Sequence, residues 1–123
     1  FGQPQPAVDA FKEAVRLSYS EPPAFQAEVQ NALALTLAGN GNFDEALAAY
    51  RKAAELDPAK AAYQNNLGVA LRAAGKPEEA VAALQTAATL QPHEIEHYLN
   101  LAASARDMLS ATLSRSRAKF VAA

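Results

Sequence analysis

Residues 93–97 read HEIEH and match the H-E-x-x-H pattern of zinc-dependent proteases. In that pattern two histidines one helical turn apart bind zinc, and the glutamate between them activates water. Here Pro92 directly precedes His93, which places this histidine in a loop or cap. A zinc protease also needs a third ligand and a substrate cleft, and the sequence indicates neither. We interpret the segment as a polar helix start, where Glu94 and Glu96 suit the helix dipole. Adventitious metal binding by the histidine pair is the alternative.

Two other polar segments could also be taken for binding elements. Residues 39–42 (GNGN) lack the Lys-Ser/Thr pair of a phosphate-binding loop, and no strand precedes them, so we interpret them as a turn. Arg115, Arg117 and Lys119 could contact phosphate or an acidic membrane surface. We interpret them as solvated helix surface, because cations also suit a helix C-terminus. The absence of Cys excludes thiolate catalysis, disulfides and Cys-based zinc sites. We therefore predict no enzymatic activity, no catalytic residues, no metal and no cofactor.

The composition favours a single helical domain. The chain has 123 residues, half of them apolar, which is enough for one continuous core. Alanine is the commonest residue, while Gly, Pro and aromatics are sparse, and this favours helix over strand. The net charge of −2 gives no indication of nucleic-acid binding. No apolar run approaches the roughly 20 residues that cross a bilayer.

An internal repeat is the strongest pattern in the chain. Residues 41–58 (GNFDEALAAYRKAAELDP) align with residues 75–92 (GKPEEAVAALQTAATLQP) at an offset of 92 − 58 = 34. Gly41 and Gly75 stand where one helix must end and the chain must turn back, because glycine reaches positive φ cheaply. Pro58 and Pro92, the last residues of the two aligned segments, end the helix that follows each glycine, since a residue before proline avoids the α region. Ala46 and Ala80 are small enough for paired helices to touch.

This pattern resembles the tetratricopeptide repeat (TPR), a 34-residue unit with small, aromatic and proline landmarks at these spacings. Two complete repeats fit, residues 27–60 and 61–94. The resemblance implies an all-α fold, a right-handed solenoid of antiparallel helix pairs with about six helices in one domain covering residues 1–123. The aromatic residue usual early in the first helix is displaced: Tyr63 lies one place early, and Gln30 occupies the site in the other repeat.

Both flanks are predicted to be partial repeats. Residues 7–18 match the second helix of a preceding repeat, followed by a longer loop, and residues 95–122 begin like the first helix of a third. The next turn glycine is missing, because residue 109 is Leu. We predict either one long helix or a poor turn near residues 110–114. Such a helix would be an end cap or a self-association surface, and its apolar stripe would comprise Tyr98, Ala105, Leu109 and Leu113.

In a TPR stack the first helix of each repeat lines the concave face, so the resemblance also implies a partner-binding groove. The candidate groove residues are Asn31, Leu35, Asn65, Asn66, Val69, Arg72, Asn100 and Arg106. Asn66 and Asn100 are equivalent residues in successive repeats, and so are Arg72 and Arg106. Exposed asparagines could hold the backbone of an extended peptide as an asparagine ladder, or could merely be solvated. The arginines would favour an acidic segment or carboxylate.

A more specific family type is disfavoured. TPR proteins that grip the acidic tails of heat-shock chaperones use a carboxylate clamp of Lys, Asn and Arg. Only Asn66 agrees with that clamp here, and Glu96 would repel a carboxylate.

The sequence therefore predicts a protein–protein interaction scaffold, such as an adaptor or an assembly factor, that binds a protein or peptide partner in its concave groove. The alternative is a structural module that forms a homodimer through its C-terminal helix. We expect no nucleic-acid partner and no membrane span, and a soluble, cytoplasmic protein. The chain starts at Phe1 without an initiating Met, so we expect that targeting or anchoring segments could lie outside it.

Overall fold

The computed structural model describes residues 5–122 of the chain. Within this range the chain forms six α-helices and one short 3-10 segment, Ser18–Ser20. The helices are α1 (Gln5–Leu17), α2 (Pro23–Gly39), α3 (Phe43–Leu56), α4 (Ala61–Ala73), α5 (Pro77–Leu90) and α6 (Ile95–Ala122). The predicted all-α fold of six helices with a long C-terminal helix is confirmed.

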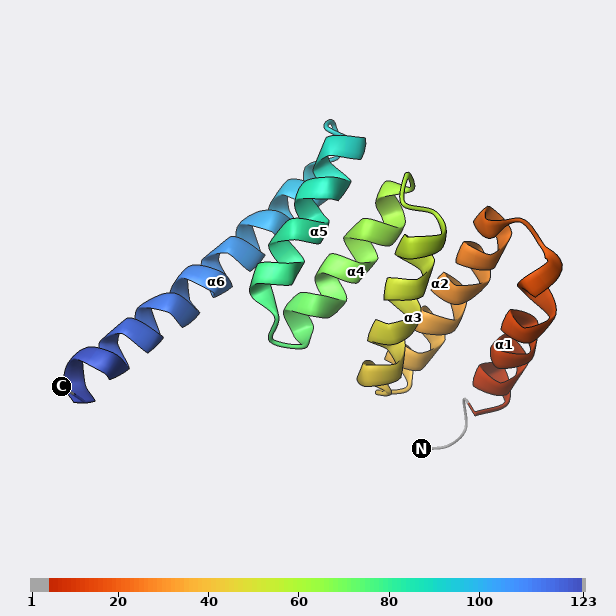
Figure 1. Ribbon diagram of the computed structural model, residues 1–123, viewed down its shortest axis with the longest axis horizontal. Helices are drawn as coiled ribbons and strands as arrows, with labels where there is room; N and C mark the ends of the chain where they lie inside the picture. The colour runs from red at the N-terminus through yellow and green to blue at the C-terminus, as the bar shows by residue number, and fades with distance from the viewer. Residues whose placement is uncertain (1–4, 123) are drawn as a thin grey trace.

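The helices form a row of antiparallel neighbours (Figure 1). Helix α2 packs on α3 and α4 packs on α5, and the contacts of α3 with α4 and of α5 with α6 join these pairs. Helix α1 packs against α2 at one end of the row. Helix α6 closes the other end and extends well beyond the neighbouring helices (Figure 1).

Glycine turns end α2 and α4 in the same way. Gly41 has φ 83° and Gly75 has φ 76°, a conformation that other residues adopt only with strain. In each turn the residue after the glycine donates its amide N–H to a carbonyl of the last helical turn, that of Leu37 or Leu71, at 2.9 Å. Both bonds belong to the Schellman type of helix cap, which satisfies carbonyl groups that the helix end leaves unpaired.

Helix α6 has no comparable stop signal. Leu109 stands where the repeat would place the next turn glycine, and the helix continues through it for 28 residues in total. Of the two alternatives left by the sequence, a single long helix is therefore the correct one. A left-handed turn at a leucine would cost about 1–2 kcal/mol, whereas continued helix costs nothing in backbone strain.

Small residues allow the helices to approach closely. The buried alanines of the paired helices include Ala34, Ala46, Ala53, Ala80 and Ala87.

The closest approach is at Gly68 of α4, where an added Cβ would lie 2.5 Å from Cγ of the buried Leu84 of α5. A side chain at position 68 would overlap Leu84, so the α4–α5 pair depends on glycine there.

Candidate partner-binding groove

Side-chain amides connect the first helices of successive repeats. Nδ2 of Asn66 in α4 donates to Oδ1 of Asn31 in α2 at 3.0 Å. Nδ2 of Asn100 in α6 donates to Oδ1 of Asn65 in α4, also at 3.0 Å. The second bond is the first one repeated 34 residues later, since 65 − 31 and 100 − 66 both equal 34. These bonds fix the spacing of α2, α4 and α6 along the side of the row that they share.

A groove of about 680 Å³ lies beside these amides, between α2, α3 and α4. It is lined by Leu35, Ala38, Phe43, Asp44, Ala46, Tyr50, Asn65, Asn66, Val69, Ala70, Ala73, Ala74 and Glu96. Three of its apolar side chains are unusually open to solvent: Leu35 is 53% exposed, Val69 45% and Phe43 67%. Because such residues are normally covered in a folded chain, their concentration in one concave surface indicates a binding surface.

The charge of the groove is negative. Asp44 and Glu96 line it, and none of the described residues that line it is a lysine, arginine or histidine. Nδ2 of Asn65 lies 3.4 Å from Oε1 of Glu96, so this carboxylate is held at the groove by an amide donor. Tyr50, which is buried and lies on α3, contributes to the same surface, and burial raises the pKa of its hydroxyl.

The sequence-predicted groove residues fall into three groups, of which the two arginines are the last. Leu35, Asn65, Asn66 and Val69 line the groove itself. Asn31 and Asn100 do not line it, although each is hydrogen-bonded to an asparagine that does.

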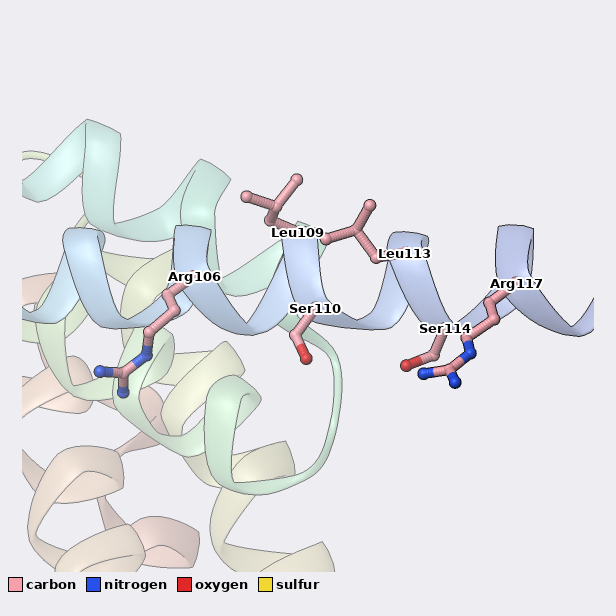
Figure 2. A pocket seen from close by; sticks show the side chains of 6 residues that line it. All are labelled: Arg106, Leu109, Ser110, Leu113, Ser114 and Arg117. Atoms are coloured by element: carbon pink, nitrogen blue, oxygen red, sulfur yellow. The ribbon is translucent and has the colours of Figure 1, made fainter.

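The two arginines lie outside the groove. Nε of Arg72 contacts Oδ2 of Asp107 at 2.6 Å, so this guanidinium is ion-paired between α4 and α6. Arg106 lies along α6, beside a separate shallow hollow, with its Nε 3.9 Å from Oδ1 of Asp107 (Figure 2). Asp107 therefore lies between the two guanidinium groups and partly neutralises their charge.

Phe43, Asp44 and Tyr50 were absent from the sequence-based set. They belong to α3, the second helix of its repeat, whereas the prediction considered only first helices. Phe43 could have been found from its position, because it directly follows the turn of residues 39–42. There it lines the same groove as Ala73 and Ala74 at the end of α4.

The HEIEH segment does not form a regular helical histidine pair. His93 is exposed and precedes the first residue of α6. His97 is buried, with Nε2 lying 3.1 Å from Oε1 of Gln91. Within residues 5–122 no cluster of three or more His, Cys, Asp or Glu side chains could hold a metal ion. In the same range no helix has both the length and the hydropathy to cross a membrane.

The repeated helix pairs, glycine caps and inter-repeat amide bonds agree with a comparison against protein families. The family model described as "Tetratricopeptide repeat" matches residues 31–95, which is more than half of the chain. The chain is a tetratricopeptide-repeat protein. TPR modules are in general protein–protein interaction scaffolds, and the family is typically non-enzymatic.

Solved structures show the same fold. A crystal structure of MamA superposes with a TM-score of 0.72 at 21% identity, covering 84% of this TPR chain and 57% of MamA. A second MamA structure gives 0.74 at 20% identity, covering 87% and 56%. YrrB, described as "a TPR protein with an unusual peptide-binding site", gives 0.66 at 28% identity, covering 78% and 47%. The TPR chain thus spans about half the length of each of these structures. No curated protein matches it in sequence.

Proposed function

We propose that this TPR module is an adaptor that holds an extended segment of a partner protein in the groove between α2, α3 and α4. The observation that carries the proposal is the exposure of Leu35, Val69 and Phe43 together in one concave surface. A volume of about 680 Å³ is within the usual range for ligand sites, roughly 300–1,000 Å³, and accommodates several side chains of a bound segment.

Polar groups beside the apolar surface suit a peptide backbone. The amide of Asn66 uses its N–H in the bond to Asn31. Its Oδ1 has no hydrogen bond within residues 5–122, and neither has Nδ2 of Asn31. Asn66 therefore offers an acceptor at the groove and Asn31 offers a donor just outside it, and an extended backbone needs both kinds of group. In this arrangement the asparagines bind a partner and also connect the repeats.

Charge favours a segment with basic side chains over an acidic one. Asp44 and Glu96 line the groove, and Arg72, which an acidic segment would need, is paired with Asp107. The partner segment that fits is thus extended, carries at least one apolar anchor and has a Lys or Arg nearby. The acidic segment suggested by the sequence is the less favoured partner.

The resemblance to YrrB supports peptide binding in general, because that protein is described as having a peptide-binding site. A module that holds one segment of a partner could serve as an adaptor or assembly factor, and we propose the same broad role for this chain.

Selection from a library of random peptides displayed on phage tests the proposal. Enriched peptides are expected to contain an apolar residue near Lys or Arg and to bind the wild-type chain. Val69→Glu places a charge in the middle of the groove and should abolish this binding. Leu17→Glu is the control, since Leu17 is also an exposed apolar residue, at 61% against 45% for Val69, but lies on α1. Failure to enrich any peptide, or equal binding to Val69→Glu, would contradict the proposed site. Enrichment of acidic peptides would contradict only its charge preference.

A further inference from the structure

An apolar stripe runs along the solvent side of α6. It consists of Ile95, Leu99, Ala102, Leu109, Leu113 and Phe120, and every one of them is exposed. With Arg106 and Ser116 included, its positions alternate in steps of four and three residues. This heptad spacing keeps the stripe on one face of a helix that pairs with another helix. The structure differs here from the sequence prediction, because Tyr98 and Ala105 lie beside this stripe and not within it.

The opposite side of α6 carries the contacts with the rest of the protein. His97 and Ser104 are buried there, one heptad apart. Every residue from 112 to 121 is exposed, so the last turns of α6 have little packing of their own. Helical segments without a packed apolar face are only marginally stable in water.

Figure 2 shows this face beyond the end of the helix row. In this view Leu109 and Leu113 point upward from α6, and Arg106, Ser110, Ser114 and Arg117 point downward. These six residues line a shallow hollow of about 350 Å³. Leu109 and Leu113 are 59% and 61% exposed, and Phe120 further along the helix is 85% exposed.

The charges of α6 are separated along its length. Glu94 and Glu96 lie at its start, while Arg115, Arg117 and Lys119 lie near its end, where Arg115 is paired with Glu78 of α5 at 3.6 Å. Two copies of α6 in antiparallel orientation would place the basic end of one beside the acidic end of the other. Parallel copies would place like charges together, and the antiparallel arrangement also aligns the helix dipoles favourably.

From these observations we propose that the occupant of the stripe is a second copy of this chain, paired antiparallel through α6 in a two-fold symmetric dimer. In the register that overlaps the two helices fully, Leu113 faces Ala102 of the second copy, and Ile95 faces its Phe120. Large side chains thus meet small ones on either side of the centre, since Leu99 likewise faces Ser116, while at the centre Arg106 of each copy lies opposite Leu109 of the other. Arg117 lies on the same side as the second copy's Glu96. The helix of 28 residues provides about four heptads of contact. The apolar stripe is separate from the apolar side chains of the groove, because Leu35 and Val69 lie on α2 and α4, and Glu96 borders both surfaces.

Sedimentation over a range of protein concentrations tests the dimer. The wild-type chain should show a reversible monomer–dimer equilibrium. Leu113→Glu should raise the dimer dissociation constant by more than about tenfold, because it places a charge in the centre of the stripe. The control Thr112→Glu changes an exposed neighbour outside the stripe and should leave the constant unchanged. A monomer at all concentrations, or equal effects of the two variants, would overturn the proposal.

Disulfide trapping tests the orientation, because the chain contains no Cys of its own. Mixing Ile95→Cys chains with Phe120→Cys chains under oxidising conditions should give mostly mixed disulfide dimers. Disulfides formed mainly between identical variants would indicate parallel pairing and overturn the antiparallel arrangement. Glu96→Lys should weaken the dimer, and adding Arg117→Glu should restore it, whereas no restoration would contradict the proposed charge pairing.

Discussion

Nδ2 of Asn66 donates a hydrogen bond to Oδ1 of Asn31 at 3.0 Å, and this bond joins the first helices of two successive repeats. Asn100 aligns with Asn66 in the next repeat, and its Nδ2 donates the corresponding bond to Oδ1 of Asn65, which aligns with Asn31. Residues that are equivalent in sequence are therefore not the residues that touch. The two amide bonds link α2 to α4 and α4 to α6 beside the groove.

A double-mutant cycle can distinguish asparagines that touch from asparagines that only occupy equivalent positions in the repeats. Asn31→Ala and Asn66→Ala should be coupled by about 0.5–1.5 kcal/mol in the free energy of unfolding, because they remove the two halves of one hydrogen bond. Asn66→Ala and Asn100→Ala should be additive, since the two side chains belong to different bonds. Urea unfolding of the single and double variants provides the measurement. Strong coupling of Asn66 with Asn100 would contradict the bonding pattern.

Gly68 should not tolerate a methyl group. Gly68→Ala places a Cβ 2.5 Å from Cγ of Leu84, which is fully buried and has little room to move. We expect a loss of about 1–3 kcal/mol in the free energy of unfolding. Gly39→Ala is the control, because an added Cβ there meets no atom within 4 Å. That variant should be neutral or more stable by up to about 1 kcal/mol, since alanine favours helix. Equal effects of the two substitutions in thermal unfolding would show that Leu84 can move aside for a Cβ at position 68.

Tyr50 should make stability fall at alkaline pH. Burial raises its pKa above the ordinary value of 10.0, so the folded state holds the hydroxyl proton more tightly than the unfolded state. This contribution to stability is complete below about pH 10 and falls as the pH rises above it, because the unfolded chain then loses the proton first.

Tyr50→Phe should therefore show a smaller decrease in unfolding free energy between pH 8 and values above about pH 10 than the wild type. Tyr19→Phe changes a side chain that is 71% exposed and should follow the wild-type pH dependence. Urea unfolding across this pH range measures both. A pH dependence that Tyr50→Phe leaves unaltered would be inconsistent with a buried hydroxyl at this position.

Removal of the Ser104 hydroxyl should stabilise the protein. Oγ of Ser104 is buried and has no hydrogen-bond partner among residues 5–122, and such a group costs on the order of 1 kcal/mol. Ser104→Ala should raise the melting temperature by more than Ser110→Ala does. Ser110 lies on the exposed side of the same helix, so its substitution measures the helix propensity of alanine alone. A lower melting temperature for Ser104→Ala would indicate that the hydroxyl has a partner in solution.

The positions at which the helices end could be predicted well from the sequence, because they depend on local residues. The turns after α2 and α4 need a positive φ, which Gly41 and Gly75 adopt easily. Leu109 does not, so α6 continues through it. The ends of these helices therefore follow from single residues.

The partners of the groove side chains depend instead on how far one helix is shifted along its neighbour. That shift arises from side-chain packing between helices, which a repeat alignment does not contain. For this reason the bonds of Asn31 with Asn66 and of Arg72 with Asp107 could not be predicted from the sequence. The groove residues themselves remain predictions until a partner is bound.

The most direct test of the groove is NMR of the ¹⁵N-labelled chain with a peptide selected from the phage library. If the partner segment binds in the groove, the largest chemical-shift changes are expected at Leu35, Phe43, Asn66 and Val69. Residues 109–121 of α6 should change little. Changes concentrated on α6 or on the outer faces of α1 and α5, with Leu35 and Val69 unaffected, would contradict binding in the groove.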